Sequence, residues 1–523
     1  MSKTLLKSTV VTGGMTFVSR VTGLVRDVLL ARLIGASAGV SADAFYVAFR
    51  IPNFFRRIFG EGAFSQAFVP VFVEYDARET AQSRSEFLDS MTGVLSLVLF
   101  AVTAAGVIAA PLLVMVLAPG FIGDGGKFDL TVQMLRITFP YLMFISLVAM
   151  AAGMLNARGR FGAAAFTPVL LNLSLIGAAL WLAPRVDEPV IALAWGVFIA
   201  GFVQLAFQLP FLARLRILPR PRLRAGHAGV KRVFRLMLPA VFGSSVAQIN
   251  LLVNTVLASF LVTGSVSWLY YSDRLMEFPL GVFGIALATV ILPSLSRSHA
   301  EASAEQFSNL MDWALRWVFL IGVPATVALA VLAEPMLATL FHYGAFTGHD
   351  VHMSALSLVA FAIGLPGFIL VKVLAPGFYA RQDTATPAKV AVAAMAVNIA
   401  VSLALVYPLA HTGLALAVSI AAFVNAGLLY GLLRRQGVYA PRGGWALFLA
   451  RVGAASAALG AALWWGAGDG GQWLAMALWE RIARLAALVA GGMVIYVIAI
   501  AAVGIRPREL LLRKVVERLA TDG

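Results

Sequence analysis

Cysteine is absent from this chain of 523 residues, which excludes disulfides, thiolate metal sites and thiol nucleophiles. Charge is scarce too: Asp, Glu, Lys and Arg make up 12% of the residues, where a soluble domain has about 25%. The alternation of polar and apolar residues that barrel strands require is also missing. Apolar residues instead reach 60% and form repeated runs of roughly 18 or more, each able to cross a hydrocarbon core about 30 Å thick. We therefore predict an all-α polytopic membrane protein.

The basic residues lie mostly on one side of the predicted membrane. We expect about fourteen transmembrane helices, and with both termini in the cytoplasm most of the 40 Lys and Arg fall in cytoplasmic segments, as the positive-inside rule requires. The first apolar stretch contains Arg20 and no small-residue cleavage site, so we expect a retained helix. The net charge of +15 then reflects topology and contact with membrane lipids. We expect no nucleic acid partner, because nucleic acid binders carry their cations on exposed faces.

The two halves of the chain repeat each other. Ser41, Tyr46, Arg50, Phe54, Phe59 and Gly60 recur 224 positions later as Ser265, Tyr270, Arg274, Phe278, Phe283 and Gly284. The offset crosses six expected spans, an even number, so equivalent helices keep the same orientation. We predict two six-helix lobes related by a parallel repeat, at 1–220 and 221–440. Residues 441–523 would add two C-terminal helices and a cytoplasmic tail.

Charged residues interrupt the first, second and eighth expected spans. An arginine at the centre of a membrane helix costs roughly 2.5–3.5 kcal/mol, so these side chains must face water or one another. In the second span the spacing of three and four residues draws one polar stripe, formed by Asp43, Tyr46, Arg50, Asn53, Arg57 and Glu61. A cluster in which arginine exceeds acid suits a phosphate or pyrophosphate, because the planar guanidinium binds two oxygens and keeps its charge. The alternative is that some of these residues form structural ion pairs.

Two polar segments outside these spans could suggest an active site, but neither has the pattern that one requires. Residues 123–127 read GDGGK, but they lack the glycine spacing and the Ser or Thr of a phosphate loop, and we expect an outside loop. His342, His349, Asp350 and His352 lie in a polar connection between spans, where we expect no metal ligand. Motifs for bond-making chemistry are missing. We therefore predict a transporter without metal or cofactor, and not an enzyme.

The segment 41–70 closely resembles the MurJ (MviN) family of lipid II flippases, in the multidrug/oligosaccharidyl-lipid/polysaccharide exporter superfamily; it reads SADAFYVAFRIPNFFRRIFGEGAFSQAFVP. Further stretches that are similar to family signatures read SRVTGLVRD at 19–27, SVSWLYYSDRLMEFPLGVFGIAL at 265–287 and VKVLAPGFYARQDTATP at 371–387. The resemblance covers nearly the whole chain. It implies a multi-pass protein of the bacterial cytoplasmic (inner) membrane, active in peptidoglycan synthesis. Its substrate would be lipid II, an undecaprenyl-pyrophosphate-linked glycopeptide, moved from the cytoplasmic to the periplasmic leaflet by alternating access.

The resemblance also implies which residues line the cationic cavity. They are Arg20, Arg26, Asp43, Arg56, Asp273, Arg274 and Glu277, to which the repeat and the polar stripe add Arg50 and Arg57. Pro52 can shift the helical phase between Arg56 and Arg57, so we keep both. The last two helices would hold the polyprenyl tail, and contacts with the cell-wall synthesis machinery are a further expectation. The alternatives are a flippase for another polyprenyl-linked glycan, a membrane-embedded glycosyltransferase or polymerase, and a scaffold.

Overall fold

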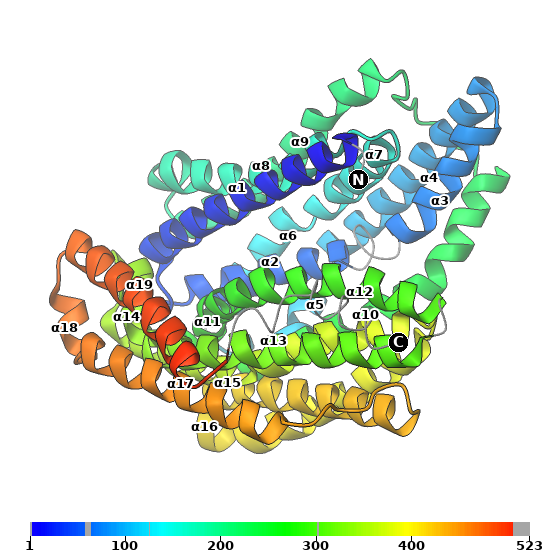
Figure 1. The fold of residues 1–523 in the computed structure, drawn as a ribbon. Helices are drawn as coiled ribbons and strands as arrows, with labels where there is room; N and C mark the ends of the chain where they lie inside the picture. The colour runs from blue at the N-terminus through cyan, green and yellow to red at the C-terminus, as the bar shows by residue number, and fades with distance from the viewer. Residues whose placement is uncertain (1–2, 58–63, 125, 301–302, 506–523) are drawn as a thin grey trace. The chain divides into compact units, whose positions relative to one another are not determined.

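The computed structural model describes residues 3–57, 64–124, 126–300 and 303–505. Throughout these ranges the regular structure is helical, as the missing alternation predicts (Figure 1). Glu61 of the expected polar stripe and the expected C-terminal tail beyond residue 505 lie outside the described residues.

Packing divides the chain into two compact units, which we describe separately. The first consists of Met1–Ser267 with Tyr343–Phe346, and the second of Trp268–His342 with Thr347–Gly523. The repeat places a boundary near residue 220, whereas packing places it after α10 (Ala228–Ser259), because α10 contacts helices of the first unit. The ranges 1–220, 221–440 and 441–523 stay a prediction about the duplication.

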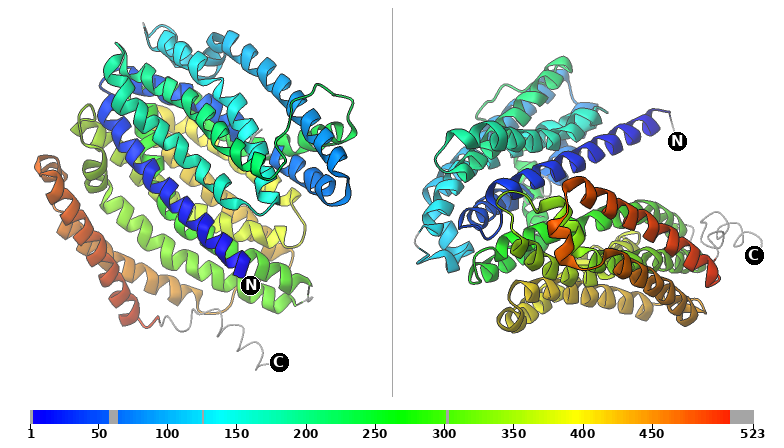
Figure 2. Two further views of the ribbon diagram at one scale, coloured as in Figure 1. Left: turned by 90° about the horizontal axis from the view of Figure 1, so that it is seen from above. Right: turned by 90° about the vertical axis from the view of Figure 1, so that its left-hand side faces the viewer.

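The first unit is built on two aligned helices, α1 (Lys3–Ile34) and α8 (Phe161–Gly177), which run side by side (Figures 1 and 2). Its core contains a ladder of aromatic rings at a spacing of four residues, Phe64, Phe68 and Phe72, with neighbouring centroids 5.2 and 5.7 Å apart. The remaining elements are α2 (Ser41–Phe55), α3 (Ser65–Arg78), α4 (Ala81–Ile108), α5 (Ala110–Leu117), η2 (Pro119–Phe121), α6 (Lys127–Thr138), α7 (Tyr141–Ala157), η3 (Ala178–Leu182), η4 (Ala183–Arg185) and α9 (Pro189–Arg214).

The second unit ends in two helices, α17 (Trp445–Ala467) and α19 (Leu478–Ala502), which pack beside α13 (Ala304–Val331). The longest helix is α16 (Ala385–Arg435), which bends at Ala410 with φ 48° and ψ −132°, two residues after Pro408. This bend separates the two spans that the sequence predicts there. The other elements are α11 (Ser265–Pro279), which begins at the end of the first unit, η5 (Leu280–Gly284), α12 (Ile285–Ala300), α14 (Ala333–Phe341), α15 (Gly348–Tyr379) and α18 (Gly470–Ala475).

Nine helical stretches in the described ranges are long and apolar enough to cross a membrane. One of them is α16, which covers two expected spans, whereas α2 and α11 each end after 15 residues and do not qualify. This architecture agrees with the polytopic membrane fold that the sequence predicts. The count of fourteen spans stays a prediction.

The internal repeat is visible in the helix ends. α4 and α13 are both 28 residues long, and each begins at a hydroxyl cap. Thr80 accepts from the backbone N–H of Ser83, and Ser303, 223 residues later, accepts from that of Gln306. A side-chain oxygen at this position satisfies one of the N–H groups that a helix start leaves without a partner. These equivalent caps agree with the predicted duplication, which stays a prediction.

Candidate functional site

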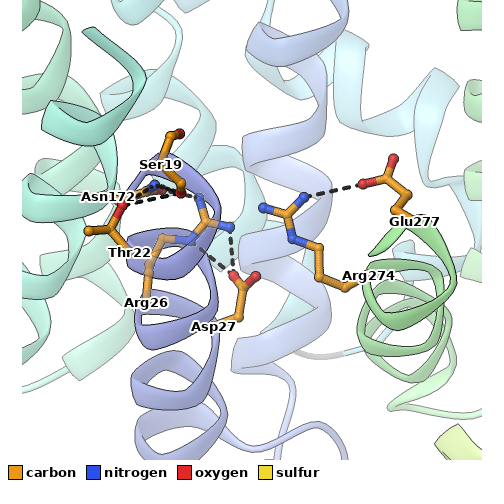
Figure 3. Close-up of polar contacts among 7 residues, drawn as sticks. All are labelled: Ser19, Thr22, Arg26, Asp27, Asn172, Arg274 and Glu277. Atoms are coloured by element: carbon orange, nitrogen blue, oxygen red, sulfur yellow. Dashed lines mark hydrogen bonds and ion pairs between the residues drawn. The ribbon is translucent and has the colours of Figure 1, made fainter. Parts of the chain in front are cut away.

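Arg26 and Asp27 are neighbours on α1 and form a buried ion pair (Figure 3). Arg26 donates to Asp27 Oδ1 from Nε at 2.9 Å and from Nη2 at 2.6 Å, and its Nη1 donates to Asn172 Oδ1 on α8 at 3.0 Å. Arg26 is 4% exposed and Asp27 is fully buried. In this conformation, groups of the protein itself hold the arginine that the sequence assigns to the substrate.

Asn172 fastens α8 to α1 at the same place. Its Nδ2 donates to the backbone carbonyl of Ser19 at 3.0 Å and to Thr22 Oγ1 at 3.1 Å (Figure 3). A buried guanidinium is tolerated only when it is paired and hydrogen-bonded, and the acid and the amide supply both conditions. Sequence reasoning missed Asn172, although a lone amide within an apolar span is a signal that it needs a buried polar partner.

The arginines of α2 and of the residues directly after it have separate partners. Arg50 Nη1 donates to Thr255 Oγ1 on α10 at 2.6 Å, and Arg56 Nε donates to Asn53 Oδ1 at 2.7 Å. Arg57 is exposed, while Arg20 on α1 is half-buried. Asn53 of the polar stripe is therefore a hydrogen-bond acceptor for Arg56. Both Arg56 and Arg57 stay candidates for the substrate site.

Asp43, at the start of α2, is buried in a dense set of donors. Its Oδ2 lies 3.1 Å from Lys127 Nζ and accepts from the backbone N–H of Gly264 at 2.8 Å. Its Oδ1 accepts from the backbone N–H and the hydroxyl of Ser267 at 3.0 and 2.6 Å. Asp43 is 1% exposed and Lys127 is 2% exposed. We name Asp43, Lys127, Gly264 and Ser267 the outer latch, because the positive-inside rule predicts this end of α2 to be external.

Sequence reasoning missed Lys127. We expected the segment 123–127 to be an outside loop, but Lys127 begins α6 and its ammonium is buried 4.3 Å from the centre of the Phe121 ring. A buried lysine requires an anion, and Asp43 is that anion. The latch therefore gives Asp43 a structural role within the first unit. Its role as a substrate contact stays a prediction.

Three candidate charges lie on α11. Arg274 Nη1 lies 3.3 Å from Glu277 Oε2, one helical turn away, and the two side chains are 37% and 47% exposed (Figure 3). Asp273 is half-buried on the same helix. The pair is accessible, unlike the Arg26–Asp27 pair, so Arg274 can exchange its partner at lower cost.

The first turns of α11 are fastened to α15. Trp268 Nε1 donates to Asp350 Oδ1 at 2.9 Å, and the hydroxyl of Ser272 donates to the carbonyl of Ser354 at 2.6 Å. Asp350 also closes a capping box with Thr347, so this acid is used at the start of α15. Across the described ranges, no group of three or more His, Asp or Glu side chains is arranged to hold a metal ion.

The predicted site residues thus fall into distinct local arrangements. In the first unit, Arg26 is held against α8, Arg50 against α10, and Asp43 in the outer latch. In the second unit, Arg274 and Glu277 form an exposed pair. Arg26, Arg50 and Arg274 carry the guanidinium groups that can bind an anion, and Asp43 and Glu277 are the acids beside lysine or arginine.

Comparison with known proteins identifies the family. The family model described as Lipid II flippase MurJ matches residues 30–483. A probable lipid II flippase MurJ of Vibrio cholerae is 46% identical over 517 residues, covering 98% of both chains. A lipid II flippase MurJ of Burkholderia cenocepacia is 44% identical over 465 residues, covering 88% of this chain and 90% of that one.

Solved structures agree with this assignment. A lipid II flippase MurJ in an inward closed conformation matches with a TM-score of 0.78 and 25% identity, covering 94% of this chain and 98% of that chain. An inward-facing multidrug transporter of the MATE family and MOP superfamily matches with a TM-score of 0.65 at 16% identity, over 82% of this chain and 98% of that one, which shows a shared fold. The chain belongs to the MurJ family of lipid II flippases.

Proposed function

We propose that the protein is a lipid II flippase, a transporter that moves the lipid-linked peptidoglycan precursor across the membrane and leaves its bonds unchanged. The observation that carries this proposal is similarity over almost the full length to relatives named as lipid II flippases, at 46% identity over 98% of the chain. The apolar composition, 60% of the residues, agrees with a membrane transporter. The lipid II specificity is carried over from these relatives.

The arginines supply the chemistry for the pyrophosphate. A guanidinium donates two parallel hydrogen bonds to phosphate oxygens and cannot lose its proton at neutral pH. Arg274, whose side chain is 37% exposed, and the neighbours Arg57, which is exposed, and Arg56, which is half-buried, are the candidates for first contact. We assign Arg20, Arg50, Asp273 and Glu277 to the remaining charged path, where the acids offset the positive charge of the arginines until substrate enters.

Arg26 requires a rearrangement before it can bind an anion. Its guanidinium is already engaged by Asp27 and Asn172 in a buried site. A substrate can shift the protein toward another conformation only through contacts that differ between the two states. Replacement of Asp27 by a phosphate group as the partner of Arg26 is such a difference. Arg26 would then bind the substrate in one conformation and Asp27 in the other.

The surroundings follow from the same proposal. The protein would lie in the cytoplasmic membrane of a bacterium with both termini inside, and would carry the precursor outward as its two repeated halves alternate in access. The polyprenyl tail would remain in lipid beside α17 and α19. Side chains such as Met493 and Val497 of α19, 67% and 64% exposed, suit an apolar environment. Contact with the wall-synthesis machinery is part of this proposal.

The test is complementation of a flippase-depleted bacterium, with leaflet exposure of the precursor assayed directly. Arg274→Ala should reach normal membrane levels and leave the precursor inside. Arg26→Ala leaves the Asp27 carboxylate buried without its guanidinium, so its flipping is compared at equal membrane level, where it too should leave the precursor inside. The matched control is Arg78→Ala, which removes an exposed arginine at the end of α3 and should support growth. Normal flipping by both site variants would refute the cationic path and leave the cluster structural.

Purified substrates separate the alternatives. A flippase for another glycan would be competed by carriers with other sugars and not by lipid II. A glycosyltransferase or polymerase would generate a new product from the lipid in vitro, whereas a flippase returns the same molecule. A scaffold would tolerate both arginine changes.

A further inference from the structure

A pocket of about 220 Å³ lies in the second unit where α14, α15 and α17 meet. Its walls are mostly apolar, formed by side chains such as Val331, Leu356 and Trp464, and within the described part of the chain Glu334 is the one ionisable residue that lines it. In Figure 1, α14, α18 and α19 lie together at this end of the unit. A carboxylate in a mostly apolar pocket attracts a positively charged group of a ligand.

Two neighbours hold the Glu334 carboxylate in place. Oε1 lies 2.8 Å from His352 Nδ1 on α15. Oε2 lies against Gly470 at the start of α18, where an added Cβ would fall 1.8 Å from this oxygen. The Glu334 side chain is still 36% exposed, so the charge remains accessible from the pocket. Glycine at position 470 is therefore what leaves room for this carboxylate.

A guanidinium lies at the rim of the same pocket. Arg484 of α19 donates to the carbonyls of Gly466 and Ala467, both at 3.1 Å. Its Nη2 would lie 3.2 Å from a Cβ at Gly468, which lines the pocket. The pocket thus has an acid in its wall and, behind Gly468, the guanidinium of Arg484, which also lies 5.2 Å from the centre of the Trp473 ring. This arrangement matches a zwitterion better than a simple cation or anion.

The position in the membrane indicates a lipid. Trp464 and Trp479 are 73% and 77% exposed near the ends of α17 and α19, and Leu356 is 41% exposed at the pocket. Exposed tryptophans mark the level of the lipid headgroups, and the positive-inside rule predicts this end of the helices to be external. An apolar wall at that level accepts the upper part of an acyl chain.

We propose that this pocket binds a zwitterionic phospholipid with a primary ammonium, such as phosphatidylethanolamine, from the outer leaflet. The ammonium pairs with Glu334 and the phosphate faces Arg484. The site is separate from the arginines of α1, α2 and α11, and the inference does not depend on the proposed transport of lipid II.

The experiment measures lipid binding to the purified full-length protein in detergent, by native mass spectrometry and by the rise in Tm on lipid addition. Phosphatidylethanolamine should bind more tightly and raise Tm more than phosphatidylglycerol with the same acyl chains. Glu334→Gln should weaken phosphatidylethanolamine binding about tenfold or more, because a charge-assisted hydrogen bond is lost. The matched control is Glu480→Gln, which removes an exposed carboxylate in the first turn of α19 and should leave binding unchanged.

A second variant separates the site from folding. Gly470→Ala keeps the charge but displaces the Glu334 carboxylate, so it should also reduce the preference for phosphatidylethanolamine. It tests the same geometry if Glu334→Gln yields no folded protein. Equal binding of the two lipids, or an unchanged preference in both variants, would overturn the proposal. If phosphoethanolamine, which has no acyl chains, binds as tightly as phosphatidylethanolamine, the pocket takes a soluble ligand. That result would overturn the proposal that a lipid occupies it.

Discussion

Asp89 of α4 and Asp312 of α13 stand 223 residues apart, and each accepts a hydrogen bond from the backbone N–H of an arginine in the linker that follows its half. Arg220 donates to Asp89 Oδ1 at 2.7 Å, and Arg442 donates to Asp312 Oδ1 at 3.1 Å. Both acids are buried, at 4% and 3% exposure. Each linker is therefore anchored by an acid at an equivalent position, although the two linkers differ in sequence.

Asp312 has more side-chain donors than Asp89, so its loss should cost more stability. Tyr439 and Trp445 donate to its Oδ1 at 2.9 and 2.7 Å, and Arg316 donates to its Oδ2 at 2.9 Å. Burial raises the pKa of Tyr439 far above its ordinary value, and the Asp312 carboxylate adds to this effect, so the hydroxyl stays a donor. Asp312→Ala should lower the free energy of unfolding by roughly 2–4 kcal/mol, because buried donors lose their acceptor.

Thermal unfolding in detergent measures this difference. Asp89→Ala is the matched variant and should lose less, since Arg222, its ion-pair partner at 3.6 Å, is 52% exposed and regains water. Asp312→Asn keeps an acceptor oxygen and should fall between wild type and Asp312→Ala. A larger loss for Asp89→Ala would contradict the account.

Asp383 gives the start of α16 a dependence on acid pH. Hydrogen bonds from Thr386, including its backbone N–H at 2.9 Å, hold the pKa of the Asp383 carboxyl below its usual value. Because the pKa is lower in the folded state, the ionised carboxyl stabilises the fold at pH values above its unfolded pKa of about 3.9. This stabilisation is lost as the pH falls through the folded-state pKa. Asp383→Ala should therefore lower Tm at pH 7, and the gap from wild type should narrow steadily below about pH 4.

Asp383→Asn serves as the control for this pH dependence. It keeps an acceptor for the Thr386 N–H but cannot titrate, so its Tm should differ from wild type by less and vary less with acid. A gap between wild type and Asp383→Ala that stays constant from neutral to acid pH would rule out the carboxylate as its source.

The sequence predicts the fold class well because its signals are local. Long apolar runs and the distribution of Lys and Arg can be read from the order of residues along the chain, and the repeat can be read by direct comparison of the two halves. The helix starts at Thr80 and Ser303 were not predicted, although a hydroxyl residue at a helix start is a local signal of the same kind. The division by packing at Ser267 could not be read this way, because it depends on which unit α10 contacts.

The candidate site is predictable in its residue types but not in its partners. The cost of an arginine in lipid predicts that Arg26 needs a polar partner, yet Asn172 is 146 positions away and no spacing rule connects them. Lys127 was missed for a similar reason: the segment before it looks like a loop, and only the fold brings its ammonium to Asp43. Pairing across helices depends on three-dimensional packing, which one sequence does not contain.

Gly364 permits the close approach of α15 and α16, so even a methyl group should disturb the second unit. A Cβ at this position would lie 2.4 Å from Ser419 Oγ and 2.7 Å from Ser419 Cα, and the backbone cannot yield. Small residues at helix contacts are a common device in membrane proteins. Gly364→Ala should destabilise by about 1–3 kcal/mol through overpacking. Gly431→Ala on α16, where a Cβ meets nothing within 4 Å, should be neutral or slightly stabilising in the same thermal assay.

The outer latch allows the structural and the substrate roles of Asp43 to be separated. Asp43→Ala leaves the buried Lys127 ammonium and the donors of Gly264 and Ser267 without their carboxylate, which should cost roughly 3–5 kcal/mol. Lys127→Met should cost less, because the carboxylate keeps its N–H and O–H donors. The double variant should be less destabilised than the sum of the single variants, since no buried charge is left alone.

Flipping assays on the same variants then decide the role of Asp43. If Asp43 acts only through the latch, Lys127→Met should reduce flipping in proportion to its loss of stability. The double variant should then recover part of the stability and part of the flipping that Asp43→Ala loses. If Asp43 also contacts the substrate, Lys127→Met should retain flipping while the double variant loses it despite its regained stability. The second outcome would make Asp43 a substrate contact like the arginines, because flipping would require its carboxylate even in a variant whose stability does not.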